Sequence, residues 1–254
     1  FRVQQGLGTT LMLRGRYHEA GPVLQEASAL ADGPLASATM RYRLAELSFK
    51  RGDKVQAAAD YEAALRLLGR YVPRSPLMRV LLLSWEAFIQ TLHTWLPALF
   101  LHRIAQPATP EQRLELKLLS GLGHTGYYCQ SIVKGMWAHL RGLNLAERLP
   151  PTAELAQAWS DHAPAISLVA MFRRGERYAL KSLRLREEMD DLWGQGQSLC
   201  YYGCNLYASS RYEECIACCR RAIRILEQTG DLWQVHIARY QVAAALYRLG
   251  DRAA

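Results

Sequence analysis

The sequence predicts an all-α protein in which helical hairpins stack side by side into a superhelix. Three observations carry this prediction. Segments recur along the 254-residue chain at a spacing of about 40 positions. Helix-capping residues stand where helices should begin. No window alternates between apolar and polar residues over the length of a strand, so we expect essentially no sheet.

The recurrence is clearest in the C-terminal half, where "DLW" at 191–193 returns at 231–233, 40 residues later. An N-terminal segment from Arg14 matches the segment from Arg51 at a period of 37. A small residue midway along each first helix lets two antiparallel helices approach closely. Because one such pair cannot bury its apolar face alone, neighbouring pairs are expected to stack. These small residues are Gly8, Ala45, Gly123, Ala163, Gly203 and Ala243.

The repeat register divides the chain into three regions. Residues 1–70 hold two repeats, residues 71–114 break the register, and residues 115–254 hold three and a half repeats. The apolar pattern of the middle region is wider than one stripe, which predicts a long helix buried on several sides and ended or kinked by Pro97. Its apolar residues are Leu77, Val80, Leu81, Leu83, Trp85, Phe88, Leu92, Trp95, Leu96, Leu99 and Phe100.

A membrane span is not expected in this region, because charged and polar residues interrupt it and a span needs about 20 almost uninterrupted apolar residues. The formal net charge of +8 is spread over both halves of the chain, so we expect no nucleic-acid partner. No basic and apolar leader is visible, and a cytoplasmic location is expected.

The expected helix starts carry residues whose side chains can accept a hydrogen bond from the first turn. Thr109, Pro110 and Gln112 form a capping-box pattern with proline at the first helical position. The other predicted caps are Ser75, Thr152, Asp191 and Asp231.

Five cysteines between positions 200 and 219 raise the question of a metal or redox site. Cys215 and Cys219 fall on packing positions of the second helix, where a free cysteine acts as a small apolar residue. A structural zinc site needs four converging ligands, usually on two turns, and this pattern is absent. We therefore predict packing, with a redox pair or a metal site as alternatives, and we expect no metal and no cofactor. The cluster is Cys200, Cys204, Cys215, Cys218 and Cys219.

The remaining motifs do not indicate catalysis. Gly121, Gly123 and Gly126 spell GxGxxG, but a helical pattern precedes them where a dinucleotide site needs a strand, so they are predicted to pack helices. The tripeptide Arg51-Gly52-Asp53 is predicted to be a turn. No nucleophile stands at a recognisable spacing from a base, and no phosphate-binding loop is present. The segment is predicted not to be an enzyme by itself.

The spacing of small residues and turns over residues 1–70 and 115–254 resembles the tetratricopeptide repeat (TPR), which forms right-handed solenoids. In that family the first helices line a concave groove. The resemblance implies that an extended peptide or a helix with some acidic groups binds there; the competing interpretation is that the tyrosines simply pack between helices. In this register the groove residues are Tyr42, Phe49, Lys117, Tyr127, Tyr207, Tyr240 and Tyr247.

Longer stretches, such as "AELSFKRGDKVQAAADYEAALRLLGRYVPRS" and "DLWGQGQSLCYYGCNLYASSRYEECI", resemble the helical region of large bacterial regulatory ATPases. The resemblance implies a non-catalytic sensor arm or scaffold in signal transduction, cut from a longer chain. It would bind a protein or peptide partner or neighbouring domains of that chain. Two other readings stay open: a stand-alone peptide-binding TPR adaptor, and a domain that senses a small ligand.

Overall fold

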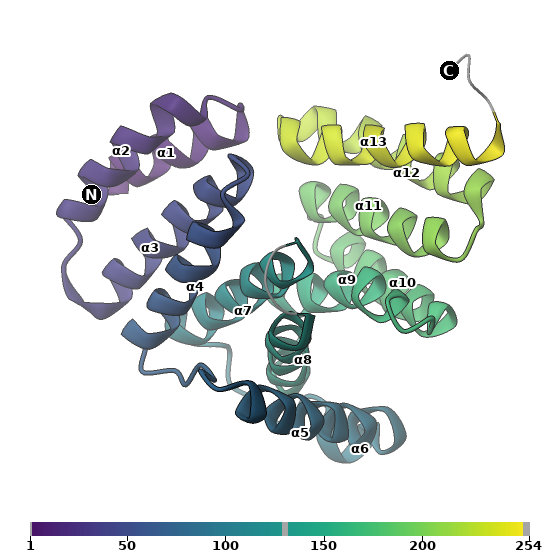
Figure 1. Ribbon diagram of the computed structural model, residues 1–254, viewed down its shortest axis with the longest axis horizontal. Coiled ribbons are helices and arrows are strands. Elements are labelled where there is room, and N and C mark those ends of the chain that lie inside the picture. Colours follow the sequence, from purple (N-terminus) through teal and green to yellow (C-terminus); the bar gives the residue numbers. More distant parts are fainter. Residues whose placement is uncertain (1, 129–131, 251–254) are drawn as a thin grey trace. The chain divides into compact units, whose positions relative to one another are not determined.

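The computed structural model describes residues 2–128 and 132–250 of the chain (Figure 1), and these ranges form helices joined by short turns, with no strand. The helices are α1 (Arg2–Leu13), α2 (Tyr17–Ala29), α3 (Gly33–Lys50), α4 (Lys54–Leu67), α5 (Pro76–Trp95), α6 (Pro97–Phe100), α7 (Pro110–Tyr128), α8 (Ile132–Arg148), α9 (Ala153–Ser167), α10 (Phe172–Glu188), α11 (Leu192–Ala208), α12 (Tyr212–Thr229) and α13 (Leu232–Leu249).

Two compact units make up the chain, residues 1–150 and residues 151–254, and the boundary falls at Pro150-Pro151. In the first unit α1 pairs with α2, α3 with α4 and α7 with α8. In the second unit α9 pairs with α10, α11 with α12, and α13 packs on α12. The prediction of an all-helical protein built from neighbouring helix pairs is confirmed. The three-region division by repeat register stays a prediction.

Small residues lie at the helix crossings, as predicted for Gly8 and Gly203, whereas the predicted crossing residue Ala243 is exposed. A Cβ atom added to Gly203 of α11 would lie 2.3 Å from the Sγ atom of Cys219 in α12. One added to Gly135 of α8 would lie 2.9 Å from the Cα atom of Gly126 in α7. Gly121, also in α7, faces the ring of Tyr61. The GxGxxG stretch therefore lies within a helix and serves helix packing.

The predicted helix caps are confirmed by their hydrogen bonds. Thr109 and Gln112 exchange a reciprocal pair, in which each backbone N–H donates to the other side chain. The side chains of Ser75, Thr152 and Asp191 each accept the backbone N–H three residues further on. Asp231 does the same at the start of α13.

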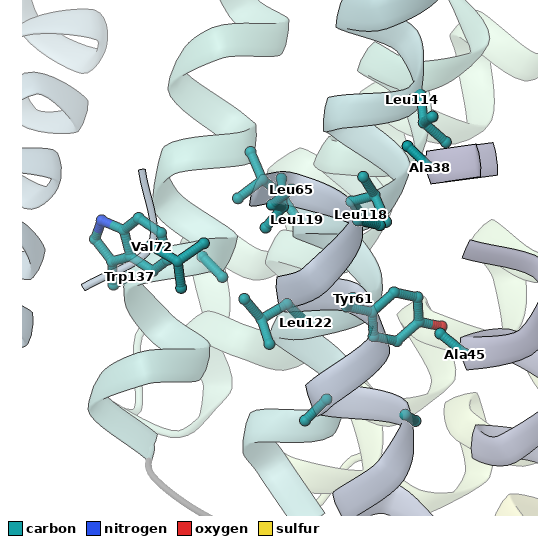
Figure 2. Packing of buried hydrophobic residues seen from close by; sticks show 14 residues of the cluster. Ala38, Ala45, Tyr61, Leu65, Val72, Leu114, Leu118, Leu119, Leu122 and Trp137 are labelled. Carbon is teal, nitrogen blue, oxygen red and sulfur yellow. The ribbon is translucent and has the colours of Figure 1, made fainter. Parts of the chain in front are cut away.

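The core of the first unit joins the α3–α4 pair to the α7–α8 pair, because α4 packs directly against α7. Figure 2 shows Tyr61 and Leu65 of α4 beside Leu118, Leu119 and Leu122 of α7, with other residues of the same cluster around them. Helices α5 and α6, which come between α4 and α7 in the sequence, therefore branch off this stack, while Val72 ahead of α5 remains part of its core.

The excursion contains α5, and here the sequence prediction of a helix buried on several sides is wrong. The buried residues of α5 are polar: Glu86, Gln90 and His93. They face α8, where Asn144 donates to both the carboxylate and the backbone carbonyl of Glu86. The predicted core residues Leu77, Val80, Leu81, Trp85, Phe88, Trp95, Leu96 and Leu99 are exposed instead, and Leu83, Leu92 and Phe100 are half-buried.

The prediction that Pro97 interrupts the helix is confirmed, because α5 ends at Trp95 and the short α6 begins at Pro97. After α6 the chain turns back onto α8. The backbone N–H groups of His102 and Ile104 donate to the carbonyls of Glu147 and Arg148, which satisfies two carbonyl groups at the end of that helix. In the described part of the chain, no helix is at once long enough and apolar enough to cross a bilayer.

Candidate protein-interaction surfaces

The predicted groove residues of the first unit are largely engaged in packing. Tyr42 of α3 is half-buried, and its hydroxyl donates to Glu46 at 2.7 Å while its ring lies 6.2 Å from that of Tyr61. Burial, aided by the nearby charge of Glu46, raises the pKa of Tyr42 well above its usual value. Phe49, two turns later, packs against the apolar core of the first unit. The ammonium group of Lys54 lies 3.5 Å from the centre of its ring.

Lys117 of α7 is exposed and lies two turns before His124, whose ring is 6.5 Å from that of Phe49. Tyr127 belongs to α7, but its side chain lies outside the described residues. The first unit thus brings Tyr42, Phe49 and Lys117 onto neighbouring helices, and of these three residues only Lys117 is exposed.

The predicted groove residues on α13, in the second unit, are more exposed than those of the first unit. On α13, Tyr240 is 69% exposed and Tyr247 is 73% exposed, seven residues apart and so on one face of the helix. Arg248 donates from Nε to the hydroxyl of Tyr207 in α11 at 3.2 Å. Tyr207 in turn meets the ring of Tyr212 edge-on at 5.5 Å. We call Tyr207, Tyr212, Tyr240, Tyr247 and Arg248 the tyrosine surface.

The face of α13 that carries Tyr240 and Tyr247 is exposed. Ala243 occupies the crossing position that Gly203 holds in α11, yet Ala243 is exposed while Gly203 is covered by α12.

The thiol cluster lies between α11 and α12, on the packing positions predicted for it. Cys215 and Cys219 are fully buried with Leu206 and Ala245. Cys200 of α11 is also fully buried. The described part of the chain holds no group of side chains arranged to bind a metal ion.

The two partly accessible thiols are held by polar contacts. Gln241 donates to Cys204 Sγ at 3.1 Å, and Cys218 Sγ donates to the carbonyl of Leu199 at 3.2 Å. Burial raises the pKa of both thiols to about 12. Since the thiolate is the reactive form, both groups are poor nucleophiles at neutral pH.

Alkylation should therefore be slow in the folded protein. At pH 8 a thiol with a pKa of about 12 is ionised to about one part in 10⁴, whereas an ordinary cysteine is ionised to about a quarter. We expect iodoacetamide to label Cys204 and Cys218 at least about 100-fold more slowly in the native chain than in urea, measured peptide by peptide by mass spectrometry. Equal rates in the two states would contradict the packing interpretation.

Helix α10 carries a stripe of basic residues that was not predicted from the sequence, because the even distribution of charge along the chain does not show which residues share a helix face. Arg173, Arg177, Lys181 and Arg184 are all exposed, and their spacing of four, four and three residues places them on one helix face. Arg174 points inward instead, donating from Nε to Nε2 of His162 at 3.1 Å. The helical spacing of the basic residues is the signal that could have found this stripe in the sequence.

The paired helices and buried crossings define an all-helical protein, and comparison with known proteins supports the same class. No family model and no curated protein matches the chain. Among solved structures it is similar to the crystal structure of BtubC (BKLC) from P. vanneervenii. The two are 15% identical with a TM-score of 0.53, over 89% of this chain and 80% of that chain. At this identity the likeness shows a shared fold.

Proposed function

We propose that this chain is a non-catalytic scaffold that binds a protein or peptide partner, with its helix pairs forming a TPR-like superhelix. The 40-residue recurrence, the small residues at the crossings and the all-helical structural neighbour support the superhelix. The resemblance to bacterial regulatory ATPases supports a place in a longer signalling chain.

The tyrosine surface is the single observation that carries the binding function. Tyrosine and arginine are enriched at the centres of protein interfaces, because each combines a large contact area with hydrogen-bonding groups. Here the exposed Tyr247 adjoins Arg248, whose guanidinium already bonds Tyr207, and the exposed Tyr240 lies two turns earlier on the same helix. Such a surface suits a segment that offers apolar side chains and a carboxylate.

A random peptide library selected on the immobilised chain tests this function. We expect enrichment of peptides that combine acidic and apolar residues. Tyr247→Ala and Tyr240→Ala should each weaken a selected peptide at least about tenfold, since truncating an interface hot spot costs about 2 kcal/mol. Isothermal titration calorimetry measures the change.

The matched control is Tyr71→Ala, because Tyr71 is also exposed and belongs to the first unit, which contributes no residue to the tyrosine surface. It should leave peptide affinity unchanged. Absence of any enriched peptide, or equal affinity of the Tyr247→Ala and Tyr71→Ala variants, would refute the proposed surface.

A further inference from the structure

Most apolar residues of helix α5 are exposed to solvent, whereas its buried residues are polar. Within this helix only Leu82 and Leu83 pack against the apolar core, so the helix largely reverses the usual amphipathic arrangement. The buried side is fixed to α8 by specific polar contacts. His93 Nδ1 lies 2.8 Å from a carboxylate oxygen of Glu147, and the side-chain amide of Gln90 donates to the same oxygen. Rotating α5 to bury its apolar side would break these contacts, so the exposed side is held outward.

The exposed side is large enough to be an interface. Leu77 is 71% exposed, Trp85 56%, Phe88 53% and Trp95 78%. The three aromatic residues alone leave about 300–450 Å² of side chain in water, given 150–250 Å² for each. With the exposed aliphatic residues beside them, the patch approaches the size of about 800 Å² per partner that stable complexes bury.

No charged residue is exposed on α5 or α6. Of the charged residues in these helices, Glu86 is buried and Arg79 is half-buried, bonded through its guanidinium to the carbonyls of Pro73 and Arg74. Two identical copies of this face can therefore approach without electrostatic repulsion. A self-complementary face is what an interface between two copies related by a two-fold axis requires.

The side chains also fit one another in such a pair. Two rows with seven-residue spacing run along the exposed side: a smaller row and a larger row. The smaller row is Leu77, Ser84 and Thr91, and the larger row is Leu81, Phe88 and Trp95.

In an antiparallel pair centred near residue 86, the smaller row of one copy faces the larger row of the other. Leu77 then meets Trp95 of the second copy, and Ser84 meets its Phe88. A parallel pair would instead oppose Trp95 to Trp95 and Ser84 to Ser84, which leaves crowding at one end and a void in the middle.

We propose that the exposed face of α5 binds the same face of a second copy of this chain, in an antiparallel two-fold pair. The contact buries the two rows against each other and leaves the polar contacts between α5 and α8 unchanged. It involves residues of the first unit only.

Sedimentation equilibrium of the full chain tests the dimer. We expect wild-type protein to dimerise at micromolar concentrations, and Phe88→Glu to weaken dimerisation at least about 100-fold, because two buried carboxylates would then lie close to the two-fold axis. Leu81→Glu provides a second variant of the same face. Val55→Glu, at an exposed position of α4, should dimerise as wild type does.

Thiol cross-linking tests the orientation. A cysteine at Ser84 lies about 6 Å along the helix axis from its symmetry mate, whereas one at Leu77 lies about 27 Å away, at 1.5 Å per residue. With the native cysteines as a common background, Ser84→Cys should form a disulfide-linked dimer under oxidation and Leu77→Cys should not. A wild-type chain that stays monomeric at about 300 µM, or that instead binds lipid vesicles as a monomer, overturns the proposal. Equal dimerisation of Phe88→Glu, or equal cross-linking at Leu77, also overturns it.

Discussion

Replacing Glu147 by alanine should release α5 from α8. The Glu147 side chain is 2% exposed and binds His93 and Gln90 of α5. Removing this carboxylate takes away the acceptor shared by two buried side chains, at a cost of about 1–3 kcal/mol for each buried hydrogen bond that is lost. We expect the amides of α5 to exchange with solvent at least about 100-fold faster in Glu147→Ala, measured by hydrogen exchange and mass spectrometry, since each 1.4 kcal/mol is a factor of ten.

Two further variants serve as controls for that result. Glu147→Gln keeps a hydrogen-bond acceptor for His93 and should cost only about 1–2 kcal/mol. Glu213→Ala removes an exposed carboxylate of α12 and should change stability by less than about 0.5 kcal/mol. If α5 exchange in Glu147→Ala stays within tenfold of wild type, the buried pair does not hold the helix.

The second large effect is expected for Gly135→Val. The atoms that the new Cβ would meet are backbone atoms of Gly126 and Gly123, so no side chain can move aside and α7 and α8 must separate. Overpacking at such a crossing costs about 3 kcal/mol, which lowers the melting temperature of a unit of this size by about 6–12 °C. Calorimetry or thermal circular dichroism measures the shift.

Gly6→Ala is the matched control for this substitution. Gly6 also lies within a helix, but a Cβ there meets no atom within 4 Å. Alanine should therefore stabilise α1 by about 0.5–1 kcal/mol through lower backbone entropy in the unfolded chain. A melting temperature of Gly135→Val at or above that of wild type would show that the two helices do not cross so closely.

Features that depend on local chemistry were predictable from sequence. A cap such as Thr109 with Gln112 needs only residues of its own turn, and Gly203 or Cys219 shows its packing role through the repeat spacing. The orientation of α5 was not predictable in this way. An apolar pattern defines one face of a helix but does not show which element packs on that face. The orientation of α5 depends on its hydrogen bonds to Asn144 and Glu147, which lie more than 50 residues further along the chain.

The same distinction between local and long-range features applies to the candidate interaction surfaces. Aromatic residues at the expected spacing were found from sequence, yet their exposure differs with their neighbours. Tyr42 packs and bonds to Glu46, whereas Tyr240 is exposed on α13. The adjacent helices determine whether such a residue is exposed and able to bind a partner. The spacing of residues along one helix does not predict this.

The direct packing of α4 on α7 means that α5 and α6 form a side branch of the first unit, which Val72, Leu82 and Leu83 attach to its core. A branch of this kind can lengthen, shorten or be exchanged for another during evolution without displacing the helices on either side. The surface of α8 beneath it is suited to such exchange, because its Asn144 and Glu147 side chains are as compatible with water as with a covering helix.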